Sequence, residues 1–192
     1  MNHAYVLIVN ACRNEDLLSR REFVWPLQRA LHYPSKVVSI STLKKSDVNA
    51  AAAVIISGCQ LKDNAFVKLI PKLKWLKQTS TPILGICAGH QVVGLIYGAK
   101  ISRAKQPVIG WTKLKKKNSH SLLNHLGKSF SAYELHGNLI SIPKEFNVVV
   151  SSTHNPNEMM VHKKKKVVGV EFHPEVRNEW LIQRFVEWAL TE

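Results

Sequence analysis

The sequence is poor in acidic residues, cysteines and long apolar runs. Its three cysteines, Cys12, Cys59 and Cys87, form no CxxC pair and leave at least one thiol without a disulfide partner. The longest apolar runs, such as AVII before Ser57, are too short to cross a bilayer, and the N-terminus lacks the pattern of a secretory signal. These absences predict a protein of the reducing cytoplasm that has no membrane-spanning segment.

Motifs for nucleotide cofactors are absent as well. There is no GxxxxGKS or GxxxxGKT phosphate loop and no GxGxxG fingerprint, so we expect no bound cofactor, and any step that needs ATP would belong to a partner protein. Metal binding is not expected either, because six histidines show no ligand spacing joined to cysteine or carboxylate: His90, His120, His125, His136, His154 and His162.

Basic residues dominate the charge. The 27 Lys and Arg outnumber the 13 Asp and Glu, which gives a formal net charge of +14. Such a field attracts nucleic acid, an anionic substrate or an acidic partner protein. The densest runs, Lys115–Lys117 and Lys163–Lys166, contain no aromatic residues for base stacking, so we predict solvated strand ends or turns there. Nucleic-acid binding is therefore not expected, and the charge suits an acidic partner.

Length and periodicity predict one α/β domain over residues 1–192. A chain of this length with 45% hydrophobic residues can bury a substantial core. In the first half, helical patterns separate continuous apolar runs, which predict strands at Tyr5–Asn10, Lys36–Ile40, Ala53–Ser57 and in the segment PILGI. Runs that are apolar on both faces predict a three-layer sandwich, in which helices cover both faces of a central, mostly parallel sheet.

Two helices of the first half have their own signals. Ser19 followed three residues later by Glu22 forms a capping-box pattern, which predicts a helix toward Leu31 that is disturbed at Pro26. A second helix is predicted between Asp63 and Lys77 from apolar residues at helical spacing: Phe66, Leu69, Ile70, Leu73 and Leu76.

The second half is different, with short β-branched segments between turn residues. They predict an antiparallel, hairpin-rich portion whose strands lie at Val108–Leu114, Phe130–Leu135, Asn147–Ser152, Glu158–Lys163 and Val167–Phe172. A last amphipathic helix is expected over Asn178–Leu190, burying Leu181, Phe185 and Trp188.

The stretch GICAGHQVVG places Cys87 at the point where a predicted strand gives way to a turn and a helix. A nucleophile in such an elbow projects above the sheet, and the next backbone N–H faces any negative charge that forms there. The strained turn requires small neighbours, and Gly85, Ala88 and Gly89 provide them. The helix N-terminus is expected to lower the thiol pKa, so the sequence predicts that Cys87 is both exposed and activated.

A candidate base occurs much later, in VVGVEFHPEV. The predicted strand ends near His173, Pro174 stops the ladder, and Glu175 follows two residues after the histidine. A histidine beside a carboxylate can be held in one tautomer and act as a general base for a thiol. Among the nine histidines, His173 alone has this setting.

Taken together, these motifs resemble those of the class I glutamine amidotransferases. GICAGHQ matches the family pattern GxCxGxQ, and GVEFHPE matches GxQFHPE, in the same order and over essentially the whole chain. The segment ELHGNLISIPKEF is similar to SHxDxVxxxPxGF of the GMP synthase branch. The resemblance implies a glutaminase that releases ammonia from glutamine for a partner synthase or synthetase.

The resemblance also implies residue roles. Cys87 would attack the amide carbon to form a thioester, with His173 as proton shuttle and Glu175 orienting it. Backbone N–H groups of Ala88 and of the Gly58–Cys59 loop would hold the oxyanion. The expected substrate-binding residues are Gln91, Leu135 and His136, of which the last two lie at the rim where a partner would dock.

Three stretches depart from the family pattern. Ser57–Gln60 replaces a loop that usually has two glycines and a proline, and Cys59 there is expected to be a buried structural thiol. Leu135 and Asn138 stand where relatives usually have serine and aspartate, and NACRNEDLLS lacks the usual acidic opening. These changes leave the triad motifs intact but bear on the pathway that the protein serves.

Two other functions remain open from the sequence. The same triad could serve a stand-alone hydrolase of γ-glutamyl amides, with a wider pocket and no partner. A non-catalytic regulatory module with the same fold is the third reading, although such a module has no need for a thiol, a base and an orienting acid together.

Overall fold

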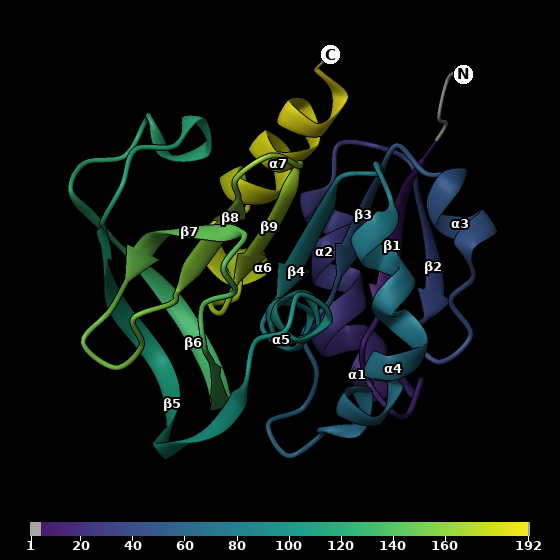
Figure 1. Cartoon of the computed structure of the whole chain (residues 1–192), viewed down its shortest axis with the longest axis horizontal. Coiled ribbons are helices and arrows are strands. Elements are labelled where there is room, and N and C mark those ends of the chain that lie inside the picture. The colour runs from purple at the N-terminus through teal and green to yellow at the C-terminus, as the bar shows by residue number, and fades with distance from the viewer. Residues whose placement is uncertain (1–4, 192) are drawn as a thin grey trace.

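The computed structural model describes residues 5–191, which share one nine-stranded sheet in the order β2-β1-β3-β4-β9-β8-β7-β5-β6 (Figure 1). The parallel part consists of β1 (Val6–Asn10), β2 (Ser35–Ser39), β3 (Ala53–Ile56), β4 (Ile83–Ile86) and β9 (Val167–Val170). The antiparallel part consists of β5 (Ile101–Lys116), β6 (Ser129–Ile140), β7 (Phe146–Ser151) and β8 (Met159–His162). The predicted mixed α/β architecture is confirmed.

Strand β9 joins the two parts, since it runs parallel to β4 on one side and antiparallel to β8 on the other. This pairing brings the end of β9 beside the end of β4, although the two strands are far apart in sequence. The residues that follow β4 and β9 include Cys87 and His173, so the topology delivers both to one edge of the sheet.

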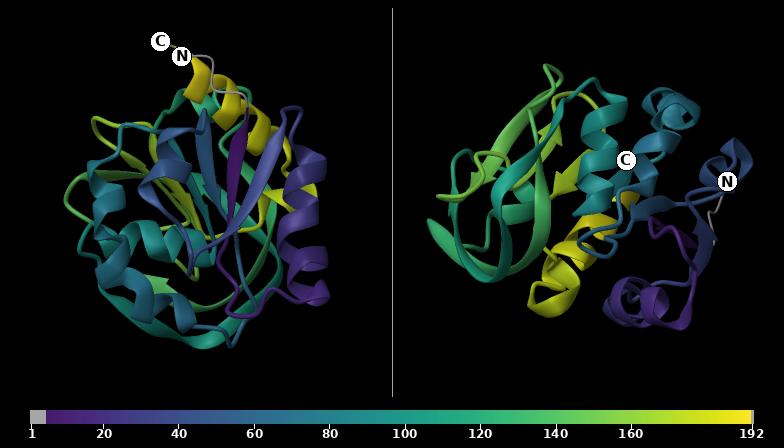
Figure 2. Two further views of the ribbon diagram at one scale, coloured as in Figure 1. Left: turned by 90° about the vertical axis from the view of Figure 1, so that its right-hand side faces the viewer. Right: turned by 90° about the horizontal axis from the view of Figure 1, so that it is seen from below.

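Alternate residues of the parallel strands pack into two separate cores. Ile8 faces a core that contains Leu27 of α2 (Trp25–Ala30) and Phe185 of α7 (Trp180–Leu190). Its neighbour Leu7 faces the other core, which is covered by α3 (Lys45–Asn49), α4 (Ile70–Leu73) and α5 (Ala88–Ile96). Seen from below, α4 and α5 lie on one side of the sheet and α2 and α7 on the other (Figure 2). Burial on both faces explains why these strands read as continuous apolar runs.

The first helical segment begins earlier than the capping box predicts. The N-cap is Asp16, whose Oδ1 accepts the Ser19 N–H at 2.8 Å, while Ser19 itself is buried in α1 (Leu17–Ser19). A π-helical turn over Arg20–Val24 then leads into α2, near whose start Pro26 lies. The predicted cap at Ser19 is therefore wrong, because the carboxylate of Asp16, three residues upstream, accepts the Ser19 N–H and caps the helix instead.

The predicted helix between residues 63 and 77 is only partly α-helical. Ala65–Leu69 and Lys74–Gln78 are 3-10 helices on either side of the short α4, where Pro71 removes one backbone donor. Phe66, Ile70, Leu73 and Leu76 are nevertheless buried, as the periodicity indicates. In the final helix Leu181 and Phe185 are fully buried, but Trp188 is only half-buried.

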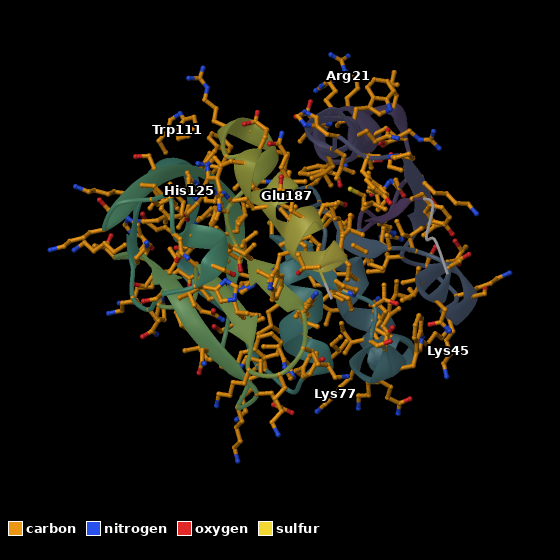
Figure 3. The ribbon with its side chains drawn as sticks, turned by 90° about the horizontal axis from the view of Figure 1, so that it is seen from above. Arg21, Lys45, Lys77, Trp111, His125 and Glu187 are labelled. Atoms are coloured by element: carbon orange, nitrogen blue, oxygen red, sulfur yellow. The ribbon has the colours of Figure 1, made fainter. Side chains whose placement is uncertain are left out.

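The lysine runs occupy the positions expected of them. Lys115 and Lys116 end β5, and residues 163–166 form the turn between β8 and β9. Figure 3 shows basic side chains such as Arg21, Lys45 and Lys77 at separate places on the periphery. Within residues 5–191, no helix has the length and apolar character needed to span a membrane.

Candidate active site

Cys87 occupies a strained elbow between β4 and α5. Its φ is 50° and its ψ is −104°, and it is the one non-glycine residue with positive φ in the described part of the chain. Such a conformation costs about 1–3 kcal/mol and persists only where the surroundings enforce it. The elbow geometry expected from the sequence is confirmed, but the predicted exposure of Cys87 is wrong, because its side chain is buried with 4% exposure.

Two glycines allow the elbow to pack. A Cβ on Gly85 would lie 2.3 Å from the Gly89 carbonyl oxygen, and a Cβ on Gly89 would lie 2.1 Å from the Ile56 carbonyl oxygen. Both obstacles are backbone atoms, so neither can move aside as a side chain would. Glycine at these positions therefore brings β3, β4 and the start of α5 into direct contact.

His173 and Glu175 form a buried pair beside the elbow. His173 follows β9, and Pro174 begins the short helix α6 (Pro174–Arg177), which carries Glu175. The distance between His173 Nδ1 and Glu175 Oε1 is 2.7 Å, and His173 Nε2 has no hydrogen-bond partner among the described residues. The carboxylate holds a proton on Nδ1, so any proton exchange with the thiol falls to Nε2.

The thiol and the imidazole each affect the pKa of the other. Burial lowers the pKa of His173, but the charges of Glu175 and Cys87 outweigh it and hold that pKa well above its usual range. Burial raises the pKa of Cys87 to about 11, although His173 acts in the opposite direction. The expectation of a lowered thiol pKa is wrong for this buried site, because desolvation exceeds the effect of the neighbouring charge. Cys87 Sγ instead lies 3.5 Å from the Leu135 carbonyl oxygen, to which it can donate.

The predicted oxyanion donors lie close to Cys87 on two elements. Ala88 is the first residue of α5, and Gly58 and Cys59 follow β3. Gly58 packs against the imidazole, since a Cβ there would lie 2.7 Å from His173 Cε1. Ala88 and Cys59 line the cavity next to Cys87. The thiol of Cys59 is buried and donates to the Asp63 carbonyl oxygen at 3.2 Å, as a structural cysteine would.

The cavity beside Cys87 is small. Its volume is about 10 Å³, room for about one water molecule. The predicted substrate residues Gln91, Leu135 and His136 all contribute to its lining. Asn138 also lines it, and its Nδ2 donates to Asn64 Oδ1 at 2.6 Å and to Gln91 Oε1 at 3.3 Å. A cavity of this size does not accommodate glutamine.

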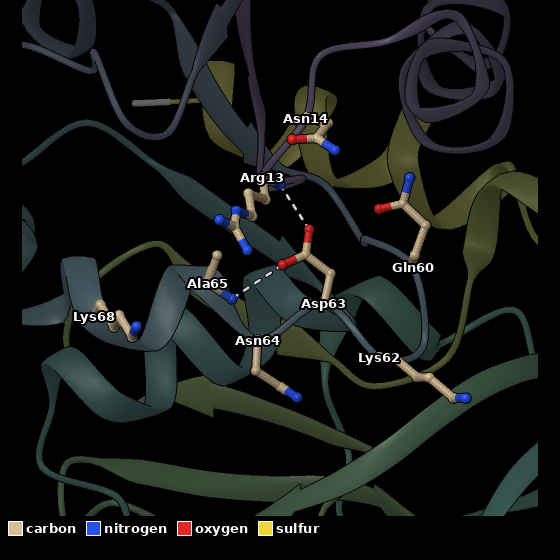
Figure 4. Close-up of a pocket in the computed structure, with 8 residues that line it drawn as sticks. All are labelled: Arg13, Asn14, Gln60, Lys62, Asp63, Asn64, Ala65 and Lys68. Atoms are coloured by element: carbon tan, nitrogen blue, oxygen red, sulfur yellow. Dashed lines mark hydrogen bonds between the residues drawn. The ribbon is translucent and has the colours of Figure 1, made fainter.

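A larger hollow lies on the other side of that loop (Figure 4). Its volume is about 630 Å³, and its lining includes Arg13, Lys62 and Lys68. Asp63 at its centre is held by backbone groups, since its two carboxylate oxygens accept the N–H of Arg13 at 2.6 Å and of Ala65 at 3.0 Å. This hollow does not include Cys87, so it neighbours the candidate site without being part of it.

A buried polar cluster lies behind the cavity, and sequence reasoning does not predict it. It contains three carboxyl groups and two imidazoles: Glu134, Glu158, Glu171, His90 and His136. The imidazole of His136 bonds Glu134 at 2.9 Å and the Asn138 carbonyl oxygen at 3.0 Å, so it supports the cavity wall from within. Glu171, in GVEFHPE, is the one visible signal, because it replaces the glutamine of the family pattern. Residues 5–191 contain no group of three His, Cys, Asp or Glu side chains placed to hold a metal ion.

A thiol elbow and a histidine–carboxylate pair at one edge of an α/β sheet are typical of hydrolases that use a cysteine nucleophile. The family model "Glutamine amidotransferase class-I" matches residues 23–188, and the chain belongs to this family of enzymes.

Its relatives include subunits of GMP synthases. One of them, a subunit of the glutamine-hydrolyzing GMP synthase of Methanococcus aeolicus, is 33% identical over 161 residues, which cover 81% of this chain and 84% of the relative. The corresponding subunit of Methanocaldococcus jannaschii is 32% identical over 165 residues, with 81% and 84% coverage. The crystal structure of a GMP synthase subunit from Thermoplasma acidophilum superposes with a TM-score of 0.84 over 98% of this chain and 96% of that one, at 23% identity.

Proposed function

We propose that this chain is the glutaminase component of a GMP synthase, in which Cys87, His173 and Glu175 hydrolyse the side-chain amide of glutamine. The observation that carries the proposal is the strained Cys87 elbow beside the buried His173–Glu175 pair, with Cys87 and His173 each affecting the pKa of the other. Sequence similarity to GMP synthase subunits over about four fifths of the chain supports the assignment to that pathway.

The chemistry follows from the arrangement. His173 Nε2 takes the thiol proton while Cys87 Sγ attacks the amide carbon, and backbone N–H groups of Ala88 and the Gly58–Cys59 loop face the oxyanion. His173 then delivers the proton to the departing nitrogen, so the C–N bond breaks, ammonia leaves and a γ-glutamyl thioester remains. Water that gives a proton to His173 attacks the thioester, which releases glutamate and restores the thiol.

The ammonia requires an acceptor on another protein. We propose a synthetase as the partner, because the small cavity does not accommodate glutamine in the free chain and a partner that moves the Asn64 loop would admit it. The formal charge of +14 favours an acidic docking surface on that partner.

Glutamine hydrolysis measured with and without a GMP synthetase and its nucleotide substrates tests the proposal. We expect ammonia release to rise at least tenfold in the complex and Cys87→Ser to abolish it. Rapid unaided turnover of other γ-glutamyl amides would instead identify a stand-alone hydrolase. Failure of Cys87 to react with the diazoketone analogue of glutamine, with or without the partner, would refute the catalytic role.

A further inference from the structure

The buried cluster behind the cavity contains more carboxyl groups than its local cations balance. Glu134, Glu158 and Glu171 are all fully buried, and carboxylates are almost never buried to this extent unless they are paired. Glu134 pairs with His136, and Glu158 accepts a hydrogen bond from Ser152 at 2.6 Å. Glu171 differs from the other two, because its hydrogen-bond partner is the carboxamide side chain of a residue that lines the substrate cavity.

That partner is Gln91. Its Nε2 donates to Glu171 Oε1 at 2.7 Å. Because a carboxylate can only accept, the amide NH₂ of Gln91 must face Glu171, and its carbonyl oxygen must point the other way. There it accepts from Asn138 Nδ2 at 3.3 Å, at the wall of the cavity. A glutamine at position 171 would not impose this direction, since an amide can either donate or accept.

The surroundings of Glu171 keep this acceptor in place. His136 bonds two acceptors, a carboxylate and a carbonyl oxygen, so both of its nitrogens carry protons and the ring is cationic; its Nδ1 lies 4.0 Å from Glu171 Oε1. From α5, His90 Nε2 lies 3.5 Å from Glu171 Oε2, and burial lowers the pKa of His90 to about 3. The backbone carbonyl oxygen of Glu158 accepts the Glu171 backbone N–H at 2.9 Å.

Protonation of Glu171 on Oε2 does not remove the acceptor. Burial raises the pKa of Glu171 to about 7, while His136, Gln91 and His173 act in the opposite direction. Whether the group is ionised or carries a proton on Oε2, Oε1 can still accept from Gln91. The orientation of the Gln91 amide is therefore retained across neutral pH.

We infer that Glu171 is a positioning residue that fixes the Gln91 carboxamide with its oxygen toward the cavity, where it selects γ-glutamyl substrates that carry a free α-ammonium group. An outward carbonyl oxygen accepts a hydrogen bond from an ammonium group, whereas an outward NH₂ would repel it. The inference rests on the proposed glutaminase function and adds a specificity determinant to it.

Glutaric acid monoamide, which is glutamine without the α-amino group, provides the test. In the complex with the synthetase, wild type should prefer glutamine. Glu171→Leu should raise KM for glutamine by about tenfold, the loss expected for one charge-assisted hydrogen bond, with kcat changed by less than about threefold. The kinetics of the monoamide should stay unchanged. The matched control, Glu158→Leu, removes a buried carboxyl that does not bond Gln91 and should leave the preference unaltered.

Two further variants make the result decisive. In a Gln91→Leu background, Glu171→Leu should have no additional effect on the preference for glutamine, because the residue acts through Gln91. Glu171→Gln, whose amide can bond Gln91 in either direction, should give an intermediate preference, and it decides the matter if Glu171→Leu does not fold. Equal losses for both substrates, or a wild-type preference in Glu171→Gln, would overturn the inference. A wild-type complex without glutaminase activity would refute the proposed function instead.

Discussion

Gly89→Ala tests whether contact between α5 and β3 holds the candidate site together. The new Cβ would lie 2.1 Å from the Ile56 carbonyl oxygen, where ordinary contact begins at 3.4 Å, so two backbone segments must separate by about 1.3 Å. Overpacking costs about 1–3 kcal/mol, and the upper end applies because the obstacle is backbone. Alanine stabilises a helix by about 1 kcal/mol relative to glycine, which offsets part of this cost. The net loss in the free energy of unfolding should be about 2 kcal/mol.

The backbone displacement caused by Gly89→Ala should reduce activity more than stability. Gly89 N–H donates to the Ser57 carbonyl oxygen at 3.1 Å, which ties the start of α5 to the loop that carries Gly58 and Cys59. Urea unfolding measures the stability, and reaction of Cys87 with the diazoketone analogue of glutamine measures the site. Gly127→Ala is the control, since a Cβ there meets nothing within 4 Å. A Gly89→Ala protein as stable and as reactive as the control would refute the close-packing argument.

Two more predictions concern the triad. Glu175→Gln should lower kcat by about 10³–10⁴ with a small change in KM, as removal of the orienting charge does in a serine-protease triad, and a loss below tenfold in steady-state assays would contradict the orienting role. Iodoacetamide should modify Cys87 in the free folded chain more slowly at pH 7 than it modifies a small thiol, and the rate should rise toward pH 11, because only the thiolate attacks and burial raises the pKa of Cys87 to about 11. The thiol of Cys87 ionises at a lower pH in the unfolded chain than in the folded protein. The raised pKa should therefore reduce the free energy of unfolding as pH rises above about 8.5. Comparison of the pH dependence of unfolding between wild type and Cys87→Ala measures this loss.

The sequence predicts those parts of the fold and site that depend on neighbouring residues. The parallel strands and the Cys87 elbow depend on short apolar runs and on small residues beside the nucleophile, so they can be recognised locally. The pairing of β9 with β4 is not local. The sequence predicts Val167–Phe172 only as a strand of the antiparallel portion, which holds for its pairing with β8, and the parallel pairing with β4 appears only in the fold. The cap of the first helix is harder to predict because Asp16 and Ser19 compete for the same role, and the burial of Ser19 decides between them.

The Glu171 cluster is beyond the reach of sequence reasoning for a different reason. Glu134 and Glu171 are 37 positions apart and lie on segments whose neighbours in the sheet are set by long connections. Only the folded sheet shows that both carboxyl groups share His136. The high pKa of Cys87 has the same origin, because the desolvation that causes it belongs to the buried site and not to the motif.

The small cavity and the neutral thiol lie beside one contact between the Asn64 loop and β6. The Asn64–Asn138 bond joins the loop to β6, the cavity beside Cys87 has a volume of only about 10 Å³, and the thiol is buried. Moving the loop to admit glutamine places polar groups beside Sγ, and this removes the desolvation that raises the pKa of Cys87. His173, already held by Glu175, then favours the thiolate with less opposition. Under the proposed function we therefore expect substrate entry and activation of the nucleophile to be coupled through this loop.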